Sequence, residues 1–414
     1  MREFIAFSLL LSLISCTTNN SLFVSLKKNK TQINFQNNLT STVDLNILNY
    51  LYYYNGAGVA AADFNNDGLA DLYFTGNQTE DKLFLNLGEL QFKDITTEAH
   101  INNPLPWTTG VTTVDINNDG FLDIYICKVG KHNAIKGKNL LYLNQGLDKN
   151  GIPVFKESAS LFGLDIVSLA TQATFFDYDK DGDLDLFLMN HSLYPNSNYG
   201  KGDTRRQKDE MSGDKLYENK QGTYVDVSSQ SGIFQGKIGY GLGVSIGDIT
   251  NDGYPDIYVG NDFFENDYLY INQKDKTFLD VISKDKTILG HTSHYSMGNA
   301  IADLNNDSQL DIVSLDMLPE NLTTYKTSGL EFPYQTYQYY LKNGYAPQFM
   351  QNTLHYNNGN GTFSETAYLS GIAATEWSWS PIVADYDNDG FKDLYITNGI
   401  LGATNDMDYI NFIS

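Results

Sequence analysis

Residues 58–75 read GVAAADFNNDGLADLYFT, in which an acidic loop separates a run of small residues from a run of β-prone residues. The loop, DFNNDGLAD, begins at Asp63 and follows the pattern D-x-[DN]-x-D-G-x-x-D. Five further copies, with minor lapses, begin at Asp115, Asp177, Asp248, Asp303 and Asp385. Recurrence of one pattern along the whole chain indicates a repeat architecture rather than a chance match.

The spacing of oxygen-bearing side chains in these loops suits a hard cation. Such side chains recur at every second position, a glycine stands at position six and an Asp closes the loop at position nine. Calcium takes roughly six to eight oxygen ligands in flexible geometry, so one loop can wrap around one ion. Asp, Asn and Gly also make good turns without any ion. The closing Asp favours calcium, up to six ions in all, because a turn has no need of a carboxylate beyond the hairpin.

Sequence on both sides of each loop is typical of β-strands. Small and β-branched residues precede it, as in GVTTVDI from Gly110, and an apolar run follows it, as in DIYVGN from Asp256. The loop is therefore a hairpin connection, unlike an EF-hand loop, which links helices and ends in a Glu at position twelve. Two more strand-like runs follow, such as LFLN from Leu83 and FKDIT from Phe92. Each unit thus predicts four up-down strands, and the series predicts an all-β fold, a β-propeller of four-stranded blades.

The predicted propeller extends over residues 22–414. We expect complete repeats over residues 58–97, 110–158, 171–228, 241–282 and 296–367, and a partial repeat over 379–414. Residues 22–40 contain LFVSL and INF, which look like two outer strands of a blade without its first two. This pair could complete the last repeat and close a six-bladed ring, which would remove exposed sheet edges. The alternative is an incomplete seven-bladed ring.

The charge balance argues against nucleic acid as a partner. With 50 Asp and Glu against 27 Lys and Arg, the formal net charge is −23, whereas phosphate binding needs a basic surface. Much of this acidity lies in the loops and fits cation binding. Cys127, in the strand-like run DIYICKV, is interpreted as a small buried hydrophobe.

The N-terminus has the features of a secreted lipoprotein. Arg2 precedes an apolar run that is too short to span a membrane, so residues 1–15 predict a signal peptide. The run ends in LISC, which resembles a bacterial lipobox. We expect cleavage before Cys16, a lipid on its thiol and a short tether over residues 16–21. The predicted location is the cell envelope, anchored in the outer membrane and facing either side; an ordinary secretory signal is the alternative.

These loops and small-residue strands resemble the FG-GAP and VCBS repeats of integrin α-subunit propellers. Residues 22–414 more closely resemble large bacterial lipoproteins of the cartilage-acidic-protein group. That resemblance rests on the stretches YYYNGAGVAAADFNNDGLADLYFTGN, GDKLYENK, QNTLHYNNGNGTFSE and ATEWSWSPIVADYDNDGFKDLYITNG. It implies seven blades followed by an ASPIC/UnbV module, so that a chain ending at Ser414 would be truncated before both.

The FG-GAP pattern implies side-chain ligands at loop positions one, three, five and nine and a carbonyl ligand at position seven. The implied calcium ligands, in chain order, are Asp63, Asn65, Asp67, Leu69, Asp71, Asp115, Asn117, Asp119, Phe121, Asp123, Asp177, Asp179, Asp181, Asp183, Asp185, Asp248, Thr250, Asp252, Tyr254, Asp256, Asp303, Asn305, Asp307, Gln309, Asp311, Asp385, Asp387, Asp389, Phe391 and Asp393.

The six loops should differ in affinity. The loops that begin at Asp177 and Asp385 carry Asp at all four side-chain positions and are expected to bind calcium most tightly. Thr250 offers the fourth loop only a hydroxyl. Ser308 replaces the turn glycine of the fifth loop, where a positive φ costs a non-glycine residue on the order of 1 kcal/mol. These two loops should be the weakest.

Two long insertions follow second strands, over residues 190–213 and 318–350, and both should lie on one face. Extended loops on a rigid scaffold are the usual place for binding, so we expect a glycan or protein ligand there. The second insertion is rich in tyrosines, which could either stack on sugar rings or cover a neighbouring blade: Tyr334, Tyr337, Tyr339, Tyr340 and Tyr345.

Enzymatic motifs are scarce. The sequence contains no G-x-S-x-G or H-E-x-x-H, and His291 and His294 have no third metal ligand close by in the chain. The predicted function is therefore a non-catalytic, calcium-binding envelope scaffold for adhesion or for binding a glycan or protein. A polysaccharide lyase or hydrolase that uses the insertions is the alternative, since propellers also carry enzymes.

Overall fold

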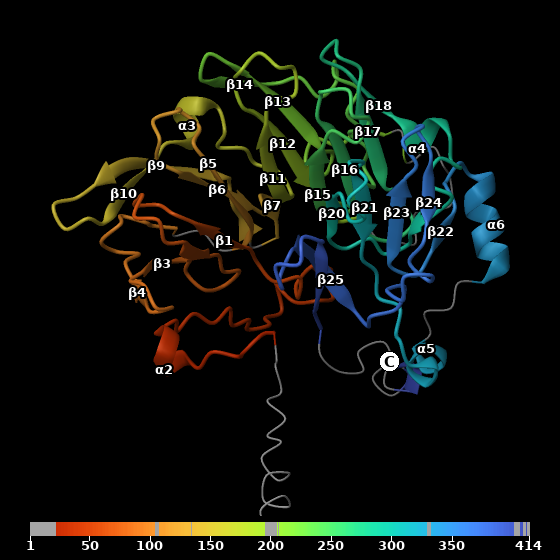
Figure 1. Cartoon of the computed structure of the whole chain (residues 1–414), viewed down its shortest axis with the longest axis horizontal. Helices are drawn as coiled ribbons and strands as arrows, with labels where there is room; N and C mark the ends of the chain where they lie inside the picture. The colour runs from red at the N-terminus through yellow and green to blue at the C-terminus, as the bar shows by residue number, and fades with distance from the viewer. Residues whose placement is uncertain are drawn as a thin grey trace, which may run out of the picture.

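Antiparallel sheets follow one another around an arc in the computed structural model of this protein (Figure 1). The structure describes residues 22–103, 107–133, 135–194, 205, 207–328, 333–400, 406–408 and 411. The predicted signal peptide and Cys16 lie outside these residues. Within them, the six repeats form five four-stranded sheets and one two-stranded sheet, so the prediction of an all-β, propeller-like fold is confirmed.

The first three sheets arise from consecutive stretches of chain. They contain β1 (Val59–Ala62), β2 (Asp71–Phe74), β3 (Lys82–Asn86) and β4 (Phe92–Asp94); β5 (Thr108–Val114), β6 (Asp123–Lys128), β9 (Leu140–Leu147) and β10 (Pro153–Glu157); and β11 (Ala170–Phe176), β12 (Asp185–Asn190), β13 (Lys215–Lys220) and β14 (Thr223–Asp226).

The other three sheets continue the same order. They contain β15 (Gly241–Gly247), β16 (Asp256–Asn261), β17 (Tyr268–Asn272) and β18 (Phe278–Asp280); β20 (Asn299–Ala302), β21 (Asp311–Ser314), β23 (Thr353–Asn357) and β24 (Phe363–Glu365); and the pair β25 (Ser378–Ala384) and β26 (Asp393–Asn398). Each acidic loop joins the first and second strands of its sheet, as the sequence predicts.

Short elements decorate the connections. Two small strand pairs are β7 (Lys131–His132) with β8 (Ile135–Lys136), and β19 (Thr292–Ser293) with β22 (Gln348–Phe349). The helices are α2 (Lys28–Thr31), α3 (Ala159–Phe162), α4 (Val281–Lys284), α5 (Leu322–Thr327) and α6 (Tyr334–Lys342). Among the described residues, no helix has the length and apolar character needed to cross a membrane.

The first strand of each sheet is the innermost and lies against the first strand of the next sheet, from β1 through β5, β11, β15 and β20 to β25. Small residues permit this crowding. A Cβ at Gly243 would lie 2.6 Å from the carbonyl oxygen of Met297, so this position between two inner strands accepts only glycine. Apolar side chains such as Phe64, Tyr73 and Phe155 fill the space between neighbouring sheets.

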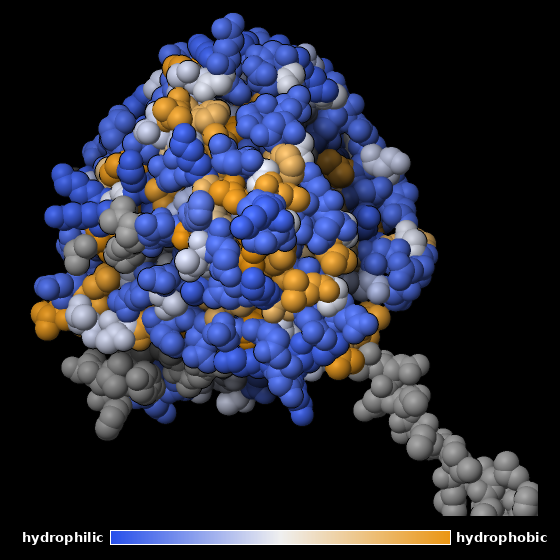
Figure 2. Space-filling view, turned by 90° about the vertical axis from the view of Figure 1, so that its left-hand side faces the viewer, coloured by the Kyte–Doolittle hydropathy of each residue, from blue (hydrophilic) through white to orange (hydrophobic). Residues whose placement is uncertain are grey.

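The surface on the side of the first two repeats is mostly hydrophilic. Hydrophobic residues appear there as separate patches among hydrophilic ones (Figure 2). The apolar side chains are thus concentrated between the sheets, where their burial stabilises the fold.

Residues 22–40 contain no β-strand, so the prediction of two outer strands in this segment is wrong. The segment instead contacts two different sheets through side chains. The ring of Phe23 makes edge contacts with Tyr386 and Tyr395 of the last repeat, whereas Phe35 stacks on Phe74 of the first. A segment that passes from one sheet to another cannot follow a single sheet edge for the length of a strand, and the backbone ladder is therefore lost.

An Asn late in the third strand links neighbouring repeats. Asn272 donates its backbone N–H to Asp256 (2.8 Å) and its side-chain amide to the carbonyl of Tyr178 in the preceding repeat (2.7 Å). The amide also reaches the carbonyl of Pro255 (3.2 Å). The equivalent residues of the second and fifth repeats, Asn144 and Asn357, bridge to a preceding loop in the same way. This Asn therefore couples blade to blade.

We predict that Asn272→Ala will destabilise the protein by about 1–3 kcal/mol, because it leaves the carbonyl of Tyr178 without this buried hydrogen bond. Urea unfolding measures the loss. Asn86→Ala is the matched control, since the Asn86 amide donates only to Ala70 of its own repeat, in an exposed position. Equal losses in the two variants would contradict the bridging role.

Candidate functional site

Each acidic loop is held by its own side chains. In the first loop, the carboxylate of Asp63 accepts hydrogen bonds from the backbone N–H groups of Asp67 (3.1 Å) and Gly68 (2.7 Å), and Asp67 accepts from Leu69 (2.9 Å). Position four has a positive φ in all six loops, with values from 56° to 61°. Ser308 also has a positive φ, 69°, as the sequence predicted for the position of the missing glycine.

Neighbouring loops are joined to one another. The side-chain amide of Asn66 donates to the carbonyl of Gly120 in the second loop (3.0 Å). The fourth and fifth loops are joined through Asn251 and Ser308 (3.0 Å), and the fifth and sixth through Asn306 and Gly390 (3.0 Å). The loops therefore lie next to each other along one face of the arc.

The closing Asp has a structural role of its own. In the first loop, Asp71 accepts from the backbone N–H of Phe64 (3.1 Å) with one oxygen and from that of Asn86 (2.7 Å) with the other. The same two bonds recur in the next four repeats. The premise that a turn has no need of this carboxylate is wrong, because the carboxylate bonds the loop to the third strand.

Burial shifts the protonation of these closing carboxyls. Burial, with a smaller contribution from the neighbouring loop carboxylates, raises the pKa of Asp71 and Asp123 to about 6 and that of Asp185 to about 7. A buried carboxylate beside other carboxylates gains from a cation that neutralises the cluster. The electrostatics of the loops thus suit an ion.

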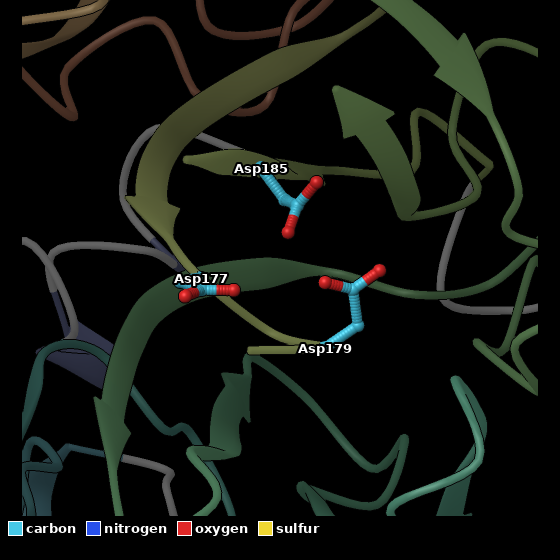
Figure 3. Close-up of side chains that lie close together, drawn as sticks. All are labelled: Asp177, Asp179 and Asp185. Carbon is cyan, nitrogen blue, oxygen red and sulfur yellow. The ribbon is translucent and has the colours of Figure 1, made fainter. Parts of the chain in front are cut away.

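Two loops bring three carboxylates together, and they are the two that the sequence ranks first. One cluster contains Asp177, Asp179 and Asp185, and the other contains Asp385, Asp387 and Asp393. In each cluster, one oxygen from every carboxylate lies within 4.8 Å of the others. Figure 3 shows the first cluster, with its carboxylates turned toward a common space. All-oxygen donor sets of this kind fit calcium.

In the other four loops, position three is an amide or a hydroxyl, which supplies no third carboxylate: Asn65, Asn117, Thr250 and Asn305. The amides of Asn65, Asn117 and Asn305 each donate to the Asp at position five of the same loop. These loops hold the implied ligands close together, but each has one formal negative charge fewer than the loops that begin at Asp177 and Asp385.

A lysine from the next repeat enters the third loop, which sequence reasoning did not anticipate. The Lys276 ammonium lies 2.6 Å from Asp179 Oδ2 and 2.6 Å from Glu218 Oε1. Lys276 is remote from the third loop in sequence, in the hairpin between β17 and β18. No local sequence pattern therefore predicts this contact. Its charge offsets part of the fourfold negative charge that made this loop a strong calcium candidate.

We predict that Lys276→Met will tighten calcium binding to the third loop about three- to tenfold, the equivalent of about 1 kcal/mol for a half-exposed charge. Competition with a chromophoric chelator measures the affinity. Lys274→Met is the matched control, because Lys274 approaches Asp252 of the fourth loop (3.4 Å) and should leave the third loop unchanged. Calcium binding no tighter in Lys276→Met than in the unmodified chain would contradict the prediction.

The two insertions meet on one face, as predicted. Leu193 and Met211 of the first and Tyr340 and Tyr345 of the second pack into one hydrophobic cluster. Arg205 of the first insertion also lies over the ring of Tyr345 (5.1 Å). The remainder of the first insertion, residues 195–204 and 206, lies outside the described residues.

A buried ion pair anchors the first insertion. The Arg205 guanidinium donates to both oxygens of Glu265 at 2.6–2.9 Å, and the Glu265 side chain is 0% exposed. Arg205 also lies over Phe234 (5.8 Å). Sequence reasoning singled out the insertion but had no signal for Glu265, which follows the second strand of the next repeat.

Some tyrosines of the second insertion cover a neighbouring blade, and others are exposed to solvent. Tyr345 is buried and Tyr340 stacks on Phe264 (4.7 Å), so these two cover a neighbouring blade. Tyr334 is 70% exposed, and Tyr337 stacks on Phe349 (5.6 Å). Tyr340 and Tyr345 therefore cover a neighbouring blade, whereas stacking of the others on sugar rings stays a prediction.

The exposed group lines a cavity of about 780 Å³. Tyr334, Tyr337 and Phe349 supply aromatic surface, and Gln348 and Gln351 supply amides. His294 is at its inner side, where its Nδ1 lies 3.0 Å from Gln348 Oε1, and burial lowers its pKa to about 4. The cavity thus combines aromatic surface with two amides and a neutral imidazole, and its lining also includes the acidic residue Glu320.

Comparison with known proteins identifies the repeat. The FG-GAP-like repeat matches residues 63–126, 248–314 and 345–396, which include five of the six acidic loops; the loop that begins at Asp177 lies outside them. The chain contains FG-GAP-like repeats. FG-GAP repeats often bind calcium, which agrees with the two carboxylate clusters.

This FG-GAP repeat protein also resembles cartilage acidic protein 1 over part of its length, which supports the cartilage-acidic-protein group. The Homo sapiens protein is 29% identical over 136 residues, or 32% of this chain and 20% of that protein. The Xenopus tropicalis protein is 30% identical over 140 residues, or 33% of this chain and 21% of that protein. The match therefore spans about a fifth of these relatives.

Among solved structures, a lectin from Agrocybe aegerita that recognises non-reducing terminal N-acetylglucosamine aligns with a TM-score of 0.43 and 15% identity. The alignment covers 83% of this chain and 75% of the lectin. A likeness at this level carries no inference about what the FG-GAP repeat protein binds.

Proposed function

We propose that this FG-GAP repeat protein is a non-catalytic, calcium-stabilised scaffold of the cell envelope that binds a glycan through the cavity of its second insertion. The observation that carries the proposal is the combination of aromatic rings and neutral amides around that 780 Å³ cavity. Sugar rings present an apolar C–H face to aromatics and hydroxyl groups to amides. A lipid on Cys16 would tether the scaffold, and calcium in the loops would hold the blades that carry the insertions.

Polar groups inside the cavity support a ligand with many hydroxyls. Gln351 is 6% exposed, and its amide nitrogen has no hydrogen-bond partner among the described residues. A buried donor without a partner costs free energy, which a hydroxyl of the ligand would offset. The exposed Tyr334 and the stacked pair of Tyr337 and Phe349 supply the aromatic surface beside it.

A glycan array with neutral and acidic polysaccharides, followed by titration of the best binder, tests the proposal. We expect Tyr334→Ala and Tyr337→Ala to weaken binding at least tenfold, as truncation of a central aromatic contact usually does. Tyr54→Ala is the matched control, since Tyr54 is 53% exposed and lies outside the cavity lining. Binding that is unaffected by both cavity variants would overturn the site, and cleavage of any bound polysaccharide would overturn the non-catalytic assignment.

A further inference from the structure

A second cavity lies where the inner strands of the arc converge. Its volume is about 330 Å³, at the lower end of the roughly 300–1,000 Å³ typical of small-molecule sites. All six repeats contribute to it, at or beside the beginning of their first strands, through Gly58, Gly110, Gln172, Leu242, Gly298 and Trp379. It shares no lining residue with the cavity of the second insertion.

Glycines shape this cavity by letting the strands approach one another. A Cβ at Gly110 would lie 2.2 Å from Gln172 Oε1, and a Cβ at Gly298 would lie 2.4 Å from the carbonyl oxygen of Trp379. Backbone therefore forms part of the wall, and the Gln172 amide lies against it.

Rings from the N-terminal part of the chain and from the third repeat form one side of the cavity. Tyr50, Tyr52, Trp107 and His191 all belong to the lining and are 5% exposed or less. His191 is held at both nitrogens, with Nε2 3.2 Å from Tyr50 Oη and Nδ1 3.3 Å from Thr171 Oγ1. Burial lowers the pKa of His191 to about 3, so its imidazole is neutral.

Two polar atoms in this lining lack partners. Among the described residues, neither Tyr52 Oη nor Gln172 Oε1 has a hydrogen-bond partner, and both atoms are buried. Tyr52 as a whole is 5% exposed. Unpaired buried polar atoms are uncommon in folded proteins and call for an occupant that pairs with them. Gln172 Oε1 requires a donor, and Tyr52 Oη can donate or accept.

The lining selects against charge. None of its residues carries a formal charge near pH 7, and a buried ion without a counter-charge is costly. The walls instead combine aromatic faces with an amide oxygen and a phenol hydroxyl. A small ring with several hydroxyl groups satisfies both, because its C–H face packs on the aromatics while its hydroxyls donate and accept.

We propose that this axial cavity binds a compact, neutral, polyhydroxylated ring of the size of one sugar residue. The ring could arrive as a free monosaccharide or as the terminal residue of a longer glycan. The site is separate from the insertion cavity, and it stands whether or not a glycan binds there.

The test uses the full chain and two substitutions that remove the unpaired atoms; Gln172→Leu also removes the Nε2 donor to the carbonyl of Val111 (3.4 Å). Neutral monosaccharides, the matching uronic acids and oligosaccharides ending in the same sugars are titrated by calorimetry. We expect at least one neutral sugar to bind, the corresponding uronic acid to bind at least tenfold more weakly, and Tyr52→Phe and Gln172→Leu each to weaken binding at least tenfold. Tyr54→Phe, which removes an exposed hydroxyl outside the cavity, should bind as the unmodified chain does.

Folding of the variants is checked independently. Tyr52→Phe removes only an unpaired buried polar atom, so its melting temperature should stay the same or rise, whereas Gln172→Leu also loses a long hydrogen bond to Val111 and should differ from the unmodified chain by only a few degrees if it is folded. Binding of free sugars identifies a monosaccharide site, whereas binding of oligosaccharides alone identifies a chain-end site; either supports the proposal. Absence of any neutral-sugar binding at millimolar concentration, or equal binding in the unmodified chain and both variants, overturns it. If Tyr334→Ala were the only variant that lost binding, the sugar would bind in the insertion cavity and the axial site would be overturned.

Discussion

Chelation of calcium with EDTA is expected to lower the melting temperature of this FG-GAP repeat protein by about 5–20 °C. An ion present at a hundredfold excess over its dissociation constant stabilises the folded state by about 2.7 kcal/mol. Two filled loops would contribute about 5 kcal/mol and six about 16 kcal/mol, and each kcal/mol moves the melting temperature of a chain of this length by about 1 °C. The lower end corresponds to the clusters at Asp177 and Asp385 alone.

Differential scanning calorimetry with and without EDTA measures the shift. Added calcium should restore the melting temperature and magnesium should not, because magnesium is smaller and demands near-ideal octahedral geometry. Asp387→Asn removes one carboxylate from the sixth-loop cluster and should shrink the EDTA effect. Identical melting curves before and after chelation would refute calcium binding as a source of stability.

Glu265→Ala is expected to destabilise the protein by about 3–5 kcal/mol. The Glu265 carboxylate is fully buried and accepts hydrogen bonds from Arg205 Nε and Nη2 at 2.6–2.9 Å. Its removal leaves the Arg205 guanidinium, whose side chain is only 14% exposed, without a counter-charge. Breaking a buried pair in this way is far more costly than losing a surface pair. Urea denaturation gives the free energy of unfolding.

Two controls separate the buried charge from the loss of side-chain volume. The double substitution Arg205→Met with Glu265→Met should recover most of the stability, because it replaces the pair with apolar side chains. Glu98→Ala breaks a pair with Lys93 at 3.3 Å that is about half exposed and should cost less than about 1 kcal/mol. If Glu265→Ala costs no more than Glu98→Ala, the anchoring role is wrong.

The propeller-like fold and the loops could be predicted because their signals are local and repeated. Strands flank every acidic loop, so each loop marks the hairpin between the first two strands of a sheet. The ranking of the loops at Asp177 and Asp385 followed from counting carboxylates, and the same two loops bring three carboxylates together in space. Predictions of this kind depend only on residues within one repeat.

Features that depend on several repeats were missed. Residues 22–40 contact two sheets through the aromatic rings of Phe23 and Phe35. The sequence of this segment nevertheless looks like that of β-strands. Lys276 reaches Asp179 from another repeat, and no spacing rule relates the two. Asn272 could have been found, since LFLN, LYLN, LYEN, LYIN and LHYN all end in Asn. The repeated Asn can be read from the sequence, whereas the sequence does not indicate that its hydrogen-bond partner is Tyr178.

The hydrogen bonds that run from Asn66, Asn251 and Asn306 to the next loop couple the first loop to the second, and the fourth, fifth and sixth loops to one another. An ion that fixes one loop also orders the carbonyl to which the adjacent loop is bonded, so filling one loop favours filling the next. Repeat arrays with such neighbour terms respond as contiguous blocks. Calcium should therefore load each of these two groups of loops over a narrower concentration range than independent sites would, and the rigidity of each group would change together with its loading.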